Sequence, residues 1–468
     1  MELKKQYFAS DLKIASVRVD ITDIGEKTYR GFSLKECEII DRIEAKITYL
    51  LADGQKFIWV GLDECSMRSR SADHIIMLIS QGLNIPISHI MMTCVHTHSA
   101  HNTGFINLQM LADILIKGAL SASNSLVSVS SIKQTVGQVE HIANRRVELP
   151  KDLGGYCVMF NNNCVVDEEQ IKIDATEQIN QYLQKNESSD YLGLDGFKEF
   201  VLGKNFDSRI HLWEFLDQKQ KPITAILRVN AHPVVVSQSR VGAKVSVDYV
   251  RVLENLVEKD LGCVCSLFNG AFGDTRPITN QYGFEDRERF ANRYFSALKK
   301  GKVSLQSYKD FTWYEFKNVQ VPLRDEMPNS IEGLQTLRDS IYARIKDKIG
   351  PAKKNFDLLE TVDGFLLDNG NIPSAIVTNK EIKDGFAVYQ INGWAIGSMK
   401  ILALPGEPLT DFALAIEKFS GVLPIGLANG YLSYLPDPSL LSMGGYEVNQ
   451  CVLNKEGLNE LINLGSYF

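Results

Sequence analysis

The sequence predicts an α/β fold in which mixed β-sheets are flanked by helices. Strand-like and helix-like patterns alternate between residues 12 and 122, and the alternation resumes at residue 208 after a polar interruption. The composition, with 44% hydrophobic and 23% charged residues, is typical of a globular protein. A chain of 468 residues is also long enough to bury a large core.

The first part of the chain is expected to contain strands and helices in turn. Strands are indicated by apolar runs or by period-two alternation, and helices by apolar residues three or four apart. In order, the segments are strands at 12–22, 42–52 and 56–62, a helix from about 71 to 83, a strand at 89–95 and a helix at 106–122. The turn Ala52-Asp53-Gly54-Gln55 predicts a hairpin, and Ser71-Ala72-Asp73 is the expected cap of the first helix.

The second part repeats these patterns. The expected segments are a hairpin at 209–216 and 223–230, a helix at 247–261, a strand at 263–268, helices at 284–300 and 331–348, a hairpin at 386–404 and a helix at 409–419. Asn392-Gly393 is the expected turn of the last hairpin. Residues 150–206 and 351–383 do not follow the alternation of strand and helix patterns. They are expected to be insertions in a single domain that spans residues 1–468.

Charge and composition exclude several classes of protein. A net charge of −7 without a basic run argues against a nucleic-acid surface. The polar N-terminus lacks the apolar centre of a signal peptide, and no apolar stretch approaches the length of a membrane span. The eight cysteines form no CxxC pair and are expected to be buried thiols in a reducing compartment. We therefore expect a cytoplasmic protein, of undetermined oligomeric state, that neither enters a membrane nor binds nucleic acid.

The histidines gather at one predicted strand end. Half of the eight lie between His89 and His101, and His96-Thr97-His98-Ser99 follows the buried strand directly. Side chains two apart on an extended chain face the same side, so His96 and His98 are expected to share one spot. The carboxyl ends of strands are where α/β sheets bind ligands, and two imidazoles there suit a metal ion. The alternative is a pair of polar residues that closes a strand.

Other predicted strands also end at polar groups, namely Asp63, His232, Asp274 and Glu407. Two histidines and one carboxylate match the ligands of hydrolytic zinc, which keeps an open coordination position. Each residue alone has a structural alternative. His232 can be a satisfied core histidine, Asp274 a turn cap, and Glu407 a solvated acid at a helix start.

Motifs spread over most of the chain resemble the catalytic domain of the neutral (non-lysosomal) ceramidase family. In the family's order they are Val17–Thr22, His96–Ser99, Asn144–Arg146, Asn230–Pro233, Val245–Asp248, Asn269–Asp274, Leu404–Glu407 and a closing tyrosine block. The resemblance implies a ceramidase catalytic-domain-like fold with the active site at strand carboxyl ends. We expect the chain to lack the family's C-terminal immunoglobulin-like domain.

The resemblance also implies a zinc site. Its ligands would be His96, His232, Glu407 and a tyrosine, for which Tyr434 is the expected residue and Tyr431 the alternative. The family mechanism is attack of a zinc-bound hydroxide on an amide carbonyl, since zinc lowers the pKa of bound water to about 7.

Three further residues match the family's catalytic positions. His98 would move protons, and Arg145 and Tyr446 would stabilise the oxyanion. They argue against a non-catalytic protein that zinc merely stabilises, because structural zinc requires no such groups.

This chain departs from the family at two positions. Arg276 stands where ceramidases carry a serine, and His101 stands where a proline is usual. With Asp274, these residues are expected to bind substrate, and the arginine favours an anionic group such as a carboxylate. We therefore expect a zinc-dependent amidohydrolase that cleaves a linear N-acyl amine in a small soluble substrate. The alternatives are an amide-forming, cyclising or ester- or lactone-opening enzyme, a true ceramidase, and a non-catalytic zinc protein.

Overall fold

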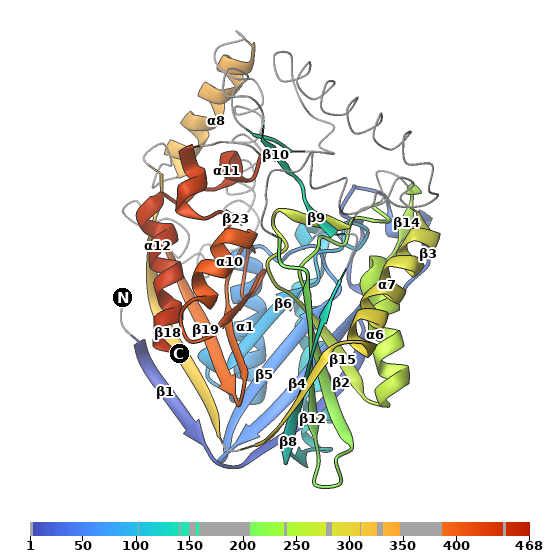
Figure 1. Ribbon diagram of the computed structural model, residues 1–468. Coiled ribbons are helices and arrows are strands. Elements are labelled where there is room, and N and C mark those ends of the chain that lie inside the picture. The colour runs from blue at the N-terminus through green and yellow to red at the C-terminus, as the bar shows by residue number, and fades with distance from the viewer. Residues whose placement is uncertain are drawn as a thin grey trace.

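A computed structural model of the chain confirms the α/β class (Figure 1). It describes residues 3–101, 103–139, 142–148, 156–158, 206–237, 241–277, 283–308, 310–324, 331–346, 386–442 and 446–468. The predicted insertion at 351–383 lies outside the described residues. So does the insertion at 150–206, apart from Tyr156–Val158 and residue 206.

Three five-stranded sheets form the framework. The first sheet has the order β6 (Ile90–Cys94), β5 (Gln55–Leu62), β4 (Glu44–Ala52), β2 (Leu12–Asp20) and β7 (Val127–Ser128). The second has the order β15 (Val264–Asn269), β13 (Pro222–Val229), β12 (Arg209–Leu216), β8 (Ser131–Gln138) and β17 (Lys302–Ser307). The third has the order β1 (Leu3–Ala9), β18 (Phe311–Pro322), β19 (Phe386–Ile396), β20 (Met399–Ala403) and β22 (Leu423–Ile425).

Aromatic side chains from all three sheets share one core. The four tryptophans of the chain, Trp59, Trp213, Trp313 and Trp394, are each at most 1% exposed. The rings of Trp59 and Trp394 stack at 4.7 Å, which joins the first sheet to the third. Burial of such large side chains supplies much of the hydrophobic free energy that holds the sheets together.

Helices cover the outer faces of the sheets (Figure 1). α1 (Ser69–Leu83) and α2 (Leu108–Ser123) pack on the first sheet, and α6 (Asp248–Leu261) and α7 (Phe284–Lys299) on the second. On the other side lie α10 (Thr410–Glu417) and α12 (Lys455–Asn463), which pack near the third sheet, and α8 (Ile331–Lys346). No helix in the described ranges has both the length and the apolar character needed to span a bilayer.

Two sequence predictions about local structure are wrong. α1 begins at Ser69 and has no side-chain cap, so Ser71-Ala72-Asp73 lies inside the helix. Asn392-Gly393 is not a turn, because β19 runs through it and pairs with β18 and β20 on its two sides. Gly393 serves close packing instead, since an added Cβ would lie 2.2 Å from Cζ of Phe468. The turn falls at Gly397, whose φ of +57° suits glycine.

Parallel pairs of strands at the edges of the three sheets meet at one place. The pairs are β5 with β6, β13 with β15, and β20 with β22. Side-chain Nδ2 of Asn269 donates to the carbonyl of Cys94 at 3.1 Å, and the amide of Gly426 donates to the carbonyl of Asn269 at 2.9 Å. These bonds tie the three edges together, so loops after strands of different sheets converge there.

A buried histidine in β12 makes stability depend on pH. His211 is 3% exposed, and burial, followed by the charge of Arg228, lowers its pKa to about 3 from the ordinary 6.5. The unfolded chain therefore takes up a proton at His211 below pH 6.5 that the folded protein excludes. Stability falls as pH falls through this window, by about 1.4 kcal/mol per pH unit.

We expect His211→Gln to remove this contribution. Between pH 7 and pH 5 the wild-type protein should lose about 2 kcal/mol more unfolding free energy than the variant in urea titrations. His74→Gln, on α1, is the matched histidine control. Equal losses in wild type and His211→Gln would contradict the expectation.

Candidate metal centre

Three side chains from distant parts of the chain form a buried cluster. His96 follows β6, His232 follows β13, and Glu407 begins β21 (Glu407–Pro408), which pairs with β23 (Tyr434–Leu435). Oε2 of Glu407 lies 3.0 Å from Nε2 of His232 and 3.4 Å from Nε2 of His96. All three residues are at most 4% exposed. Their ligand atoms lie within 4.8 Å of one another, so the cluster can hold a metal ion.

The hydrogen bonds behind the two imidazoles fix how they face the cluster. Nδ1 of His96 lies 2.8 Å from the carbonyl oxygen of Cys65, and Nδ1 of His232 lies 3.2 Å from that of Thr275. A carbonyl only accepts, so both Nδ1 atoms carry a proton and both Nε2 atoms face Glu407. Apart from their approach to each other at 3.0 Å, Nε2 of His232 and Oε2 of Glu407 have no hydrogen-bond partner among the described residues. Buried atoms left in this state are what a bound cation satisfies.

The pKa shifts within the cluster favour an ionised Glu407 that lies against both imidazoles. Burial opposes ionisation of Glu407, but the two histidines lower the pKa of its carboxyl well below the ordinary value. Burial lowers the pKa of His232 to about 4. Burial opposes a positive charge on His96, but Glu407 and Cys65 together outweigh it and raise the pKa of His96 well above the ordinary value. The ionised carboxylate and neutral His232 are the forms in which these residues bind a metal.

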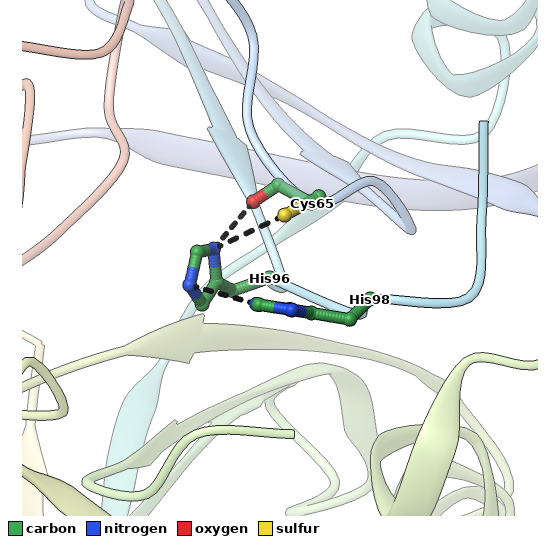
Figure 2. A group of neighbouring side chains, drawn as sticks. All are labelled: Cys65, His96 and His98. Carbon is green, nitrogen blue, oxygen red and sulfur yellow. Dashed lines mark hydrogen bonds between the residues drawn. The ribbon is translucent and has the colours of Figure 1, made fainter. Parts of the chain in front are cut away.

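His98 lies beside His96 (Figure 2). Its Nε2 is 3.4 Å from Nε2 of His96, and its ring is half-buried. We expected residues 96–98 to be extended, with both histidines on one side of the chain. That expectation is wrong, because His96 has a left-handed φ of +72°. The rings meet through this bend instead, nearly perpendicular at 88°.

Cys65 lies on the opposite, Nδ1 edge of His96 (Figure 2). Its Sγ is 3.6 Å from Nδ1, beside the carbonyl that accepts the Nδ1 proton. Cys65, His96 and His98 form a second group of possible metal ligands. Because Nδ1 of His96 is already engaged by a carbonyl, we assign Cys65 to orienting His96.

A second polar group adjoins the cluster around Arg145. Its Nε donates to Oε1 of Glu447 at 2.8 Å, and its Nη2 donates to the hydroxyl of Tyr434 at 3.1 Å. Nη1 of Arg146 donates to the other oxygen of Glu447 at 2.7 Å. Glu447 is fully buried, so two arginines hold its charge and it in turn fixes Arg145. The hydroxyl oxygen of Tyr434 thus accepts a hydrogen bond from Arg145.

Asp274 joins the Arg145 segment to the Glu407 segment. Its Oδ1 accepts from the amide and hydroxyl of Thr410, and its Oδ2 accepts from Nδ2 of Asn144 at 2.8 Å. The carbonyl of Asp274 accepts from the amide of Arg145 at 2.7 Å. Gly273 permits this approach, because an added Cβ would lie 2.7 Å from the carbonyl oxygen of Glu407.

The remaining predicted site residues lie as follows. His101 is fully buried, with Nδ1 2.5 Å from Oε1 of Glu64 and Nε2 2.9 Å from the carbonyl of Thr22. Arg276 is 5% exposed in β16 (Thr275–Pro277). Tyr446 begins α11 (Tyr446–Gln450), and its side chain lies outside the described residues. The direct roles of His101, Asp274, Arg276 and Tyr446 in substrate binding or catalysis stay predictions.

Tyr431 contacts the cluster through Glu407. Its hydroxyl donates to Oε1 of Glu407 at 2.9 Å, and its backbone is held on both sides by the hydroxyl of Ser69. Tyr434 makes its described bond to Arg145 instead. Tyr431 therefore selects Oε2 as the oxygen of Glu407 that faces the two histidines.

We expect Tyr431→Phe to weaken metal binding about 10- to 100-fold, the usual cost of losing a group that orients a ligand. Chelator competition measures the affinity, and the visible spectrum of the cobalt-loaded protein reports the ligand geometry. Tyr467→Phe, near the C-terminus, is the matched control. An unchanged affinity and spectrum in Tyr431→Phe would show that Glu407 is positioned without it.

Sequence patterns did not reveal Glu447, Tyr431 as a partner of Glu407, or the carbonyls of Cys65 and Thr275. Glu447 had one available signal, its place directly after Tyr446. The carbonyl groups had none, because every residue carries one.

Solved structures share this architecture. Neutral ceramidase from Pseudomonas aeruginosa matches with a TM-score of 0.63 and 13% identity, over 97% of this chain and 73% of that one. A structure described as a ceramidase complexed with C2 matches with a TM-score of 0.61 and 12% identity, over 97% of this chain and 74% of that one. By sequence, no protein-family model and no curated protein matches. The fold is ceramidase-like, as predicted, and it carries a candidate metal centre.

Proposed function

We propose that this protein is a zinc-dependent hydrolase that cleaves a linear amide, an N-acyl amine, in a small substrate. The observation that carries the proposal is the convergence of His96, His232 and Glu407 beside Arg145 in a ceramidase-like fold. The donor set, two imidazoles and one carboxylate, is that of hydrolytic zinc. Tyr434, which binds Arg145, is the proposed fourth ligand.

The side chains around the cluster have the chemistry that amide hydrolysis needs. When bound, zinc polarises a carbonyl and makes water acidic enough to ionise near neutral pH. Arg145 keeps its charge, because Tyr434 and Glu447 more than offset the effect of burial on its pKa. Its guanidinium is therefore a fixed donor for a carbonyl oxygen that becomes negative. Tyr446 is the proposed second donor.

His98 is the proposed proton carrier. Burial, and then the charges of His96 and His232, lower its pKa well below the ordinary value, so its imidazole is neutral. A neutral imidazole beside the cluster can take a proton from the nucleophile and pass it to the leaving amine.

Hydrolysis by a His98→Ala variant tests the proposal. A panel of N-acyl amines, from N-acetyl compounds to a short-chain ceramide in detergent, is incubated with the zinc-loaded protein, and the released amine is measured. We expect hydrolysis by wild type and a loss of about 100-fold or more in His98→Ala, at unchanged metal content. His74→Ala is the control. Equal activity in His98→Ala and wild type would reject the assigned role, and no release from any amide would reject the hydrolase.

A further inference from the structure

A turn near the N-terminus lies on the segment that carries His98. The turn is Thr28–Phe32, closed by bonds from the amide of Thr28 to the carbonyl of Phe32 and from the amide of Gly31 to the carbonyl of Thr28, at 2.9 and 2.8 Å. The amide of Tyr29 donates to the carbonyl of Ala100 at 2.8 Å, and Thr28 pairs with His101. The position of this turn is therefore fixed relative to His98.

His101 is the residue that docks the turn. Its two ring nitrogens face Glu64 and the carbonyl of Thr22, so it joins the end of β5 to the segment that leads into the turn. Gly25 packs on the ring so closely that an added Cβ would lie 2.7 Å from Cδ2 of His101. His101 is thus a positioning residue for residues 22–32, and a proline could make neither ring contact.

The turn places a cation over the aromatic ring that contacts His98. The ring of Tyr29 lies 5.1 Å from the ring of His98, and the guanidinium carbon of Arg30 lies 5.4 Å from the ring of Tyr29. Arg30 is exposed, and none of the acidic side chains in the described ranges pairs with it.

Arg30 has no acidic partner among the described residues, and in this it differs from Arg145, which also lies near the cluster. Arg145 uses its N–H groups on Glu447 and Tyr434. A guanidinium that stacks on an aromatic face keeps the N–H groups of its edge available, and two parallel N–H groups match the two oxygens of a carboxylate. In a protein of net charge −7, an uncompensated cation next to a reactive centre favours an anionic ligand.

We propose that Arg30, supported by Tyr29, binds a carboxylate or a similar anionic group of the substrate while the amide lies at the metal centre. This inference rests on the proposed function for the amide and on the turn for the anion. It assigns the substrate class as an N-acyl compound that carries a negative charge a few bonds from its amide, such as an N-acyl amino acid.

Binding of two matched probes to the zinc-loaded protein tests the proposal. N-acetylglycine carries the carboxylate, and N-acetylglycinamide replaces it with a neutral amide of similar shape. We expect Arg30→Gln to reduce the preference for N-acetylglycine about tenfold, as loss of a charge-assisted bidentate contact requires. Arg30→Lys should retain part of the preference. The preference for N-acetylglycine should also weaken with added salt. Lys27→Gln, in the same segment, is the charge-matched control and should keep the wild-type preference.

The outcomes separate this proposal from the proposed function. The anion site is overturned if Arg30→Gln prefers N-acetylglycine as strongly as wild type does. It is also overturned if wild type does not prefer N-acetylglycine at all. Because these are binding measurements, they do not depend on turnover. A protein that binds zinc and hydrolyses amides without preferring the anion keeps its function and loses this inference. One that prefers the anion through Arg30 but hydrolyses nothing keeps the site and loses the function.

Discussion

Glu407→Gln is expected to abolish tight metal binding and, with it, hydrolysis. The carboxylate is 1% exposed and lies between the Nε2 atoms of His96 and His232. Glutamine preserves the shape of the side chain but not its charge, so a buried dication would lose the compensation that makes its binding favourable. Since loss of an orienting group alone costs about 10- to 100-fold, we expect the affinity to fall by more than about 100-fold.

Chelator competition and amide hydrolysis measure the effect. The matched control is Glu38→Gln, which removes an exposed carboxylate paired with Lys244 and should change neither quantity. Wild-type affinity and activity in Glu407→Gln would mean that the cluster is a structural polar group, not a metal centre.

Lys46→Met is expected to destabilise the fold by about 3–5 kcal/mol, the range for breaking a buried ion pair. The ammonium of Lys46 is fully buried between Asp63 and Glu254, 2.7 Å from Oε2 of Glu254. Methionine fills a similar volume, but it leaves two buried carboxylates with less compensation, of which Asp63 retains Arg251. The loss matters for the site, because Asp63 directly precedes the Glu64–Cys65 segment that holds His96.

Urea unfolding followed by tryptophan fluorescence measures this change, since all four tryptophans are buried. Lys302→Met, on the exposed edge strand β17, should stay within about 0.5 kcal/mol of wild type. A similarly small change in Lys46→Met would show that the carboxylates are neutral or hydrated in the folded protein.

The elements of the fold were largely predictable, because hydrophobic periodicity is a local property. The hairpin β4–β5, the strand β6 and the helix α6, closed by Gly262, lie within two residues of the predicted bounds. The turn predicted at Asn392-Gly393 failed because glycine serves tight packing as well as turns, and only tertiary contacts distinguish the two uses.

The candidate site was predictable where its residues carry a motif. His96, His232 and Glu407 each follow a strand in a recognisable stretch, and the structure brings them together. The groups that orient these three residues were not predictable from the sequence. Some are backbone carbonyls, such as those of Cys65 and Thr275. Others are side chains, such as Tyr431 and Glu447, that act across the fold. Arg30 was not predictable for the same reason, because nothing local indicates that its turn docks beside His98.

Metal analysis of the purified protein, with zinc in the growth medium, tests the central claim most directly. We expect about one zinc ion per chain in wild type, loss of that ion in both His96→Ala and His232→Ala, and its retention in His74→Ala. A folded wild-type protein without bound metal, or one whose metal survives the loss of either cluster histidine, would contradict it.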